Sequence, residues 1–71
     1  MRLLRKKATF IPYFMRDKYR TIKEDAEPVH GVVTYVNRKH GWFCVSYRAG
    51  NTIQREGFKF CDIGEVVTVH G

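Results

Sequence analysis

The sequence lacks long apolar runs and repeats, and it has few cysteines. No stretch approaches the roughly 20 apolar residues that a membrane-spanning helix requires, and residues 1–7 lead into no signal-peptide hydrophobic region. The two cysteines, Cys44 and Cys61, are too few for the disulfide framework of a small secreted domain. We therefore expect a soluble, cytoplasmic protein with reduced thiols.

Patterns that accompany catalysis or metal binding are also missing. No nucleophile lies in a recognisable motif, no carboxylate pair lies near a candidate acid or base, and no glycine loop precedes a helix. The sequence contains no CxxC or HxxxH spacing. A zinc site built from the two cysteines with His40 and His70 would therefore be unusual. We expect no enzymatic activity, no metal and no cofactor.

Enough apolar residues are present for one small folded domain that spans residues 1–71. Apolar residues make up 44% of the chain and aromatic residues 14%, which is sufficient for a globular core. A chain this short buries only about 60% of the surface that its unfolded form exposes. We expect a thin margin of stability.

Acidic residues are scarce in the N-terminal third of the chain. Residues 1–23 contain eight basic side chains and one acidic one, whereas the remaining 48 residues contain five basic and six acidic ones. The net charge of +6 is therefore concentrated in this basic N-terminal segment. Such asymmetry is typical of an arm or face that attracts phosphates or an acidic partner, although it can also serve only to keep a small protein soluble.

Short β-branched and aromatic runs between turn residues predict a meander of strands in residues 30–71. A first strand around residues 32–36 is followed by a tight loop at residues 37–41. In the next strand the side chains alternate between two faces. The face predicted to lie in the core carries Phe43, Val45 and Tyr47, and the other face carries Trp42, Cys44, Ser46 and Arg48.

Two further strands complete this meander. A hairpin turn at residues 49–51 leads into a strand over residues 52–60, with Gly57 as a bulge or bend. Phe58 and Phe60 are two residues apart in this strand and should point the same way. After a turn at residues 61–64, residues 65–70 form the last predicted strand.

The N-terminal part is less regular. Residues 8–12 are predicted to form an edge strand, where Pro12 is tolerated because no backbone donor is needed. Residues 13–23 favour a further strand over two helical turns, and residues 24–29 form an acidic connector. The fold class that follows is all-β, a small four- to five-stranded antiparallel barrel with a basic N-terminal strand or arm.

Residues 31–45, GVVTYVNRKHGWFCV, resemble the first two strands of the cold-shock domain, approximately GxVKWFNxxKGFGFI. That family is an OB-type barrel that binds single-stranded DNA and RNA. The resemblance places Tyr35 and Trp42 at base-stacking positions and His40 where the family has lysine. It also makes Phe58-Lys59-Phe60 similar to the family's second aromatic motif.

The chain departs from the cold-shock pattern at three positions. Phe43 replaces a glycine, Cys44 stands where a second stacking phenylalanine is expected, and Val36 replaces an aromatic residue. The chain also ends after what would be the fourth strand, so an N-terminal strand would have to complete a barrel. A glycine-bounded hairpin and the pattern of residues 62–67 agree equally well with an SH3-like barrel.

Two functions of different classes remain. The first is a nucleic-acid-binding module for single-stranded DNA or RNA with little sequence specificity, in which stacked bases and phosphates are bound. The residues expected to bind are Arg5, Lys6, Lys7, Tyr35, Arg38, Lys39, His40, Trp42, Phe58, Lys59 and Phe60.

The second function is a protein-interaction or inhibitor module, of the kind that phages and mobile elements encode, in which an SH3-like barrel binds an acidic protein. Basic side chains on one continuous face with Trp42 would favour nucleic acid, and basic side chains on opposite faces would favour the protein partner. We expect a monomer or a weak homodimer paired through an exposed edge strand, and no membrane association.

Overall fold

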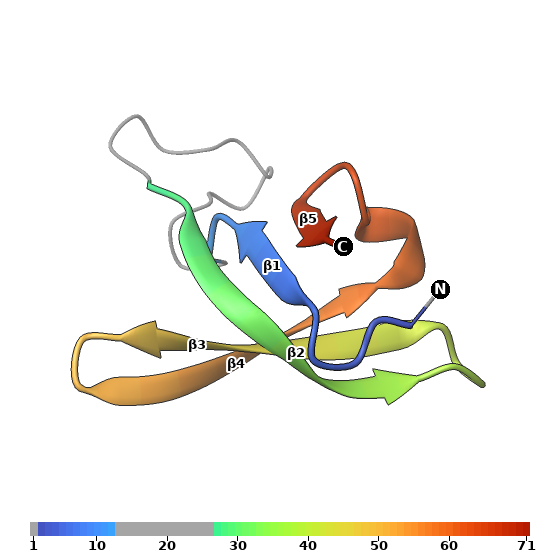
Figure 1. Cartoon of the computed structure of the whole chain (residues 1–71), viewed down its shortest axis with the longest axis horizontal. Helices are drawn as coiled ribbons and strands as arrows, with labels where there is room; N and C mark the ends of the chain where they lie inside the picture. Colours follow the sequence, from blue (N-terminus) through green and yellow to red (C-terminus); the bar gives the residue numbers. More distant parts are fainter. Residues whose placement is uncertain (1, 13–26) are drawn as a thin grey trace.

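The computed structural model describes residues 2–12 and 27–71, which form one antiparallel sheet of five strands (Figure 1). Within these residues there is no helix long and apolar enough to cross a membrane. The strand order across the sheet is β4-β3-β2-β1-β5. The elements are β1 (Lys7–Phe10), β2 (Val29–Asn37), β3 (Trp42–Ala49), β4 (Thr52–Lys59), the 3₁₀-helix η2 (Phe60–Asp62) and β5 (Val67–His70).

Strand β2 holds the two halves of the sheet together. It pairs with β1 along one edge and with β3 along the other, and it runs diagonally between them in Figure 1. The sheet curls around its core, but β4 and β5 do not pair with each other among the described residues, so the barrel is not closed. The prediction of an all-β, barrel-like antiparallel fold is confirmed.

The core lies on the inner face of this curled sheet. On β3, Phe43 and Val45 are fully buried and Tyr47 is 7% exposed, which confirms the face predicted from their alternation. Aromatic contacts extend the core across strands, because the ring of Phe10 lies edge-on to the rings of Tyr47 and Phe58. The buried apolar residues are Leu3, Ala8, Phe10, Val33, Phe43, Val45, Tyr47, Phe58 and Val67.

The predicted hairpin turns are present. Gly41 has φ of 73° in the β2–β3 turn and Gly50 has φ of 63° in the β3–β4 turn, a backbone region that favours glycine. The last strand is shorter than predicted, because the amides of Glu65 and Val66 both donate to the carbonyl of Asp62 at 3.0 Å. These residues form a turn, so β5 begins only at Val67.

The strand predicted within residues 8–12 is present as β1, but the prediction that it lies at an edge of the sheet is wrong. Strand β1 lies inside the sheet, with Lys7 paired to Val32 of β2 and to His70 of β5. Pro12 follows the end of β1, so its missing amide costs no ladder hydrogen bond. The predicted strand over residues 13–23, and residues 24–26 of the connector, lie outside the described residues.

The predicted bulge at Gly57 is also not found. Gly57 pairs with Cys44 in an uninterrupted β3–β4 ladder. The register instead shifts in β2 between Val33 and Tyr35, so that Thr34 is the extra residue. The hairpin that resembles the first two cold-shock strands is the second and third strand here, because β1 precedes it.

Candidate functional site

Along the described strands, the outer face of the sheet carries positive charge and no carboxylate. Its positions follow from the register, because residues paired with Trp42, Cys44, Ser46 and Arg48 of β3 point away from the core with them. Four Lys or Arg residues and two His residues occupy this face among the described strands, and no Asp or Glu does. These basic residues are Lys7, His30, Arg48, Arg55, Lys59 and His70.

The bulge in β2 brings Tyr35 to this outer face. Val33 pairs with buried Val45, so strict alternation would point Tyr35 inward as well. The extra residue Thr34 reverses the phase, and Tyr35 then pairs with Cys44 on the outer face. Tyr35 is 47% exposed as a result.

Tyr35 and Trp42 form an aromatic pair on the outer face. Their ring centroids are 5.1 Å apart and the ring planes are inclined by 46°. Trp42 is half-buried, and the side-chain amide of Asn37 donates to the Tyr35 hydroxyl at 3.4 Å. The pair therefore offers exposed ring surface held in a defined position, as a base-stacking platform requires.

Asn37 also shapes the basic turn beside this pair. Its side-chain Oδ1 accepts the amide of His40 at 3.0 Å, and its carbonyl accepts the amide of Gly41 at 2.9 Å. Arg38, Lys39 and His40 are all exposed in this turn. One asparagine thus fixes the basic turn and contacts the exposed tyrosine.

Lys59 supplies a charge directly next to the aromatic pair. It is exposed and lies opposite Trp42 in the β3–β4 register. Its amide donates to the Asp62 carboxylate at 2.9 Å, and the following amide, of Phe60, donates to the carbonyl of Gly41 at 2.9 Å. The end of β4 is therefore attached to the basic turn.

Phe58 is not part of the exposed surface, and Phe60 is half-buried against the core. Phe58 is 4% exposed and its ring lies 5.8 Å from that of Phe43, while the half-buried Phe60 ring lies 6.1 Å from Phe43. Both point the same way, as their spacing predicted, but that direction is inward. Because Lys59 is outward beside Trp42, the preceding residue of the strand must face the core. Assigning stacked bases to Phe58 is therefore incorrect.

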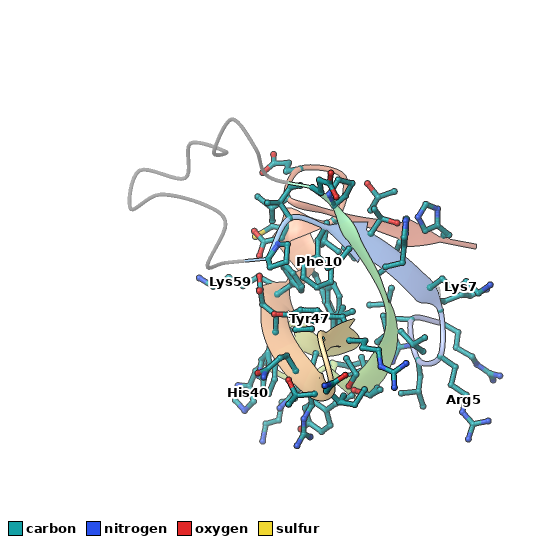
Figure 2. The ribbon with its side chains drawn as sticks, turned by 90° about the vertical axis from the view of Figure 1, so that its left-hand side faces the viewer. Arg5, Lys7, Phe10, His40, Tyr47 and Lys59 are labelled. Atoms are coloured by element: carbon teal, nitrogen blue, oxygen red, sulfur yellow. The ribbon has the colours of Figure 1, made fainter. Side chains whose placement is uncertain are left out.

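The basic residues of the N-terminal segment lie on a different side of the molecule from the Tyr35–Trp42 pair and Lys59, although Lys7 also occupies an outward position of the curled sheet. Figure 2 shows Arg5 and Lys7 on one side of the molecule and His40 and Lys59 on the other, with the core between them. Arg5 and Lys7 are exposed, whereas Lys6 is half-buried. The structure therefore divides the predicted binding residues between two sides.

A histidine pair on the outer face was not anticipated from the sequence. The Thr9 hydroxyl lies 3.0 Å from Nδ1 of His30 and 2.8 Å from Nε2 of His70. The two histidines are 40 residues apart, and only the position of β1 between β2 and β5 brings them together. No local pattern predicts this cluster.

The described residues contain neither a disulfide nor a candidate metal site. Cys44 is half-buried on the outer face, Cys61 is exposed, and both are free thiols. Among residues 2–12 and 27–71, no three His, Cys, Asp or Glu side chains are grouped so as to hold a metal ion.

Comparison of the chain with protein-family models, with curated proteins and with solved structures finds no match.

Proposed function

We propose that this protein binds single-stranded DNA or RNA, with little sequence specificity, through the outer face of β2, β3 and β4. The observation that carries this function is the Tyr35–Trp42 pair, which exposes aromatic surface beside Lys59. The bulge at Thr34 supports it, because bulges are used to re-aim side chains near functional sites.

The charge of this face suits a polyanion. Cations neutralise phosphates and release counterions, which makes binding favourable and dependent on salt. Arg55 and Lys59 lie on the same outer face as Trp42, and the turn with Arg38 and Lys39 extends from its end. Acidic residues, which would repel phosphates, are absent from the outward positions of the described strands.

The chemistry of the aromatic pair supports single strands, rather than duplexes, as the proposed ligand. Aromatic rings stack on bases that are already unstacked, so an exposed platform favours single strands over duplexes. Stacking is tolerant of sequence, since every base presents a π-face, and contributes about 1 to 3 kcal/mol per base. Among the described residues, no ordered set of hydrogen-bonding groups surrounds the pair beyond Asn37, and this supports a weak sequence preference.

The experiment is a comparison of Trp42→Ala and Tyr35→Ala with the wild type. Binding of a fluorescein-labelled mixed-sequence oligonucleotide is followed by anisotropy, because Trp42→Ala removes the only tryptophan. Each variant should weaken binding by about 1 to 3 kcal/mol while its melting temperature changes little, since both rings lie outside the core. In the wild type, the same oligonucleotide should quench Trp42 fluorescence.

Ile53→Ala is the matched control. Ile53 is 67% exposed at the opposite end of the β3–β4 hairpin, so this change removes exposed apolar surface without touching the pair. It should bind as the wild type does. The proposal would be overturned if all three variants bound the oligonucleotide as tightly as the wild type does. It would also be overturned if the wild type bound duplex DNA as tightly as the single strand.

A second candidate is a protein-interaction module that binds an acidic partner. The division of Arg5 and Lys7 from His40 and Lys59 in Figure 2 favours it, because a flat polyanion-binding face would gather these charges. Polyglutamate distinguishes the two functions in the same titration. If it quenches Trp42 as strongly as the oligonucleotide does, the acidic protein partner is supported and the nucleic acid is not.

A further inference from the structure

The chain before β1 forms a tight turn with an arginine in a backbone conformation that arginine rarely adopts. The amide of Lys6 donates to the carbonyl of Leu3 at 3.0 Å, which closes the turn, and Arg5 has φ of 70°. This is the third position of the turn, where glycine or asparagine is the usual residue. An arginine there persists only because surrounding contacts hold it.

Those contacts connect the turn to β2 and to the core. The amide of Arg5 donates to the carbonyl of Val33 at 2.8 Å, and the amide of Val33 donates to the carbonyl of Lys6 at 2.9 Å. Leu3 is 4% exposed and packs in the core. The backbone of the turn is thus fixed on both sides, and the side chain of Arg5 is exposed.

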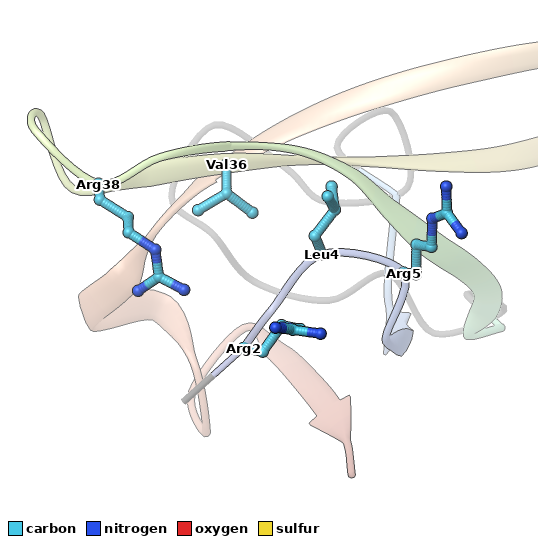
Figure 3. Close-up of a pocket in the computed structure, with 5 residues that line it drawn as sticks. All are labelled: Arg2, Leu4, Arg5, Val36 and Arg38. Carbon is cyan, nitrogen blue, oxygen red and sulfur yellow. The ribbon is translucent and has the colours of Figure 1, made fainter.

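The turn forms one wall of a pocket of about 560 Å³ between the N-terminal segment and the end of β2. In Figure 3 Leu4 and Val36 lie between Arg38 at one end and Arg5 at the other, with Arg2 beneath them. No acidic residue is among the described residues that line this pocket. Its size is within the range of roughly 300 to 1,000 Å³ that small-molecule sites occupy. The lining residues are Arg2, Leu4, Arg5, Val36 and Arg38.

We propose that this arginine pocket binds a terminal phosphomonoester, with Leu4 and Val36 contacting the attached sugar or base. A phosphomonoester carries about 1.5 to 2 negative charges at neutral pH, more than a phosphodiester inside a strand, and it presents three acceptor oxygens. Guanidinium groups are the side chains best suited to such a group, since each can donate two parallel hydrogen bonds. Three arginines line this pocket, with Arg38 and Arg5 at its two ends and Arg2 beneath Leu4 and Val36 (Figure 3).

The position of the pocket favours the end of a nucleic-acid strand as the source of this group. Val36 faces the pocket, whereas the preceding residue, Tyr35, faces outward to Trp42. A strand stacked on the aromatic pair reaches the pocket only by turning around the end of β2, where Arg38 lies, and a terminal group can do so. This assignment to an oligonucleotide end rests on the proposed function, but recognition of the phosphomonoester does not.

The experiment uses one oligonucleotide sequence in three forms, with a 5′-phosphate, with a 3′-phosphate, or with hydroxyl groups at both ends. Binding of each form to the wild type and to Arg5→Gly is measured by the quenching of Trp42 fluorescence. Glycine adopts positive φ freely, so Arg5→Gly removes the guanidinium and should keep or raise the melting temperature. The wild type should bind one phosphorylated form about three- to tenfold more tightly than the hydroxyl form, a range set by charge-assisted hydrogen bonds at a partly open site. Arg5→Gly should lose this preference.

Arg2→Ala tests a second wall of the pocket, and Arg48→Ala is the control because Arg48 lies on β3, outside the pocket. Arg2→Ala should lose the preference and Arg48→Ala should keep it. Equal binding of the phosphorylated and hydroxyl forms by the wild type would overturn the pocket while leaving the proposed function standing.

A titration with adenosine monophosphate tests the pocket independently of the aromatic pair. If no oligonucleotide quenches Trp42, but this nucleotide raises the melting temperature of the wild type and not of Arg5→Gly, the pocket is supported and the proposed function is not. If the nucleotide stabilises neither protein and phosphorylated ends give no preference, the pocket has no phosphomonoester role.

Discussion

Tyr47 introduces a phenolic hydroxyl into a largely apolar set of buried side chains. Its ring lies edge-on to that of Phe10, with centroids 5.1 Å apart and an interplanar angle of 87°. Burial, and secondly the negative charge of Glu56, raise the pKa of Tyr47 above its ordinary value of 10.0. Both causes disfavour the phenolate, so the folded protein retains this proton more strongly than the unfolded chain does.

The elevated pKa of Tyr47 predicts a loss of stability at alkaline pH. Above the unfolded-state pKa of about 10 the unfolded chain releases the phenolic proton while the folded protein still binds it, so rising pH favours unfolding until the folded pKa is passed. Urea unfolding of the wild type should therefore shift to lower midpoints between about pH 8 and pH 11.

Tyr47→Phe isolates this effect from the other groups that titrate at alkaline pH. It keeps the ring against Phe10 and removes the ionisable hydroxyl, so its midpoint should fall less over the same pH range. Identical pH profiles for the two proteins would show that the Tyr47 proton does not contribute.

Two glycines within the strands have opposite surroundings. A Cβ on Gly31 of β2 would overlap the Ser46 carbonyl oxygen of β3 and lie 2.7 Å from a methyl carbon of Val45. A Cβ on Gly57 of β4 would lie 3.9 Å from its nearest contact, the carbonyl oxygen of Phe43. Only the first glycine is required by a close approach of two strands.

Gly31→Ala should destabilise the protein by about 1 to 3 kcal/mol or more, because backbone atoms must move to admit the methyl group. Gly57→Ala should change the free energy of unfolding by less than about 1 kcal/mol, since the new contact has an ordinary distance. Urea unfolding of both variants measures the difference. Equal stability of the two variants would contradict the tight β2–β3 contact.

Local alternation made much of the strand structure predictable. The inward face of β3 and the turns at Gly41 and Gly50 follow from patterns of two to five residues. The place of β1 does not, because its neighbours β2 and β5 are distant in sequence and its short run resembles any edge strand. The bulge at Thr34 also lacks a local signal, as no glycine marks it.

The candidate site was predictable to the same degree. Trp42 on the outer face follows from alternation, and so does Lys59 beside inward Phe58, although the aromatic motif suggested otherwise. The contact between Tyr35 and Trp42 depends on the bulge; the cold-shock resemblance placed both residues at base-stacking positions but predicted no contact between them. The arginine pocket depends on how the N-terminal turn packs beside β2, which the sequence pattern does not specify.

For the whole molecule, the distribution of charge over two sides decides how a polyanion can bind. Lys59 and His40 lie on the side away from Lys7 in Figure 2. Exposed lysines contribute little to stability through individual ion pairs, so their removal changes binding more than folding. Their separate contributions can therefore be read from the salt dependence of binding.

Lys59→Gln and Lys7→Gln should differ in this salt dependence. For single strands, the logarithm of the binding constant falls with the logarithm of salt concentration by about 0.7 for each neutralised phosphate. With an oligonucleotide that has hydroxyl ends, Lys59→Gln should reduce this slope by about 0.7, because Lys59 adjoins Trp42. Lys7→Gln should leave the slope unchanged. A reduced slope in both variants would mean that the nucleic-acid strand wraps around the molecule. A reduced slope in Lys7→Gln alone would place the binding face over β1, and Trp42 would then not be part of it.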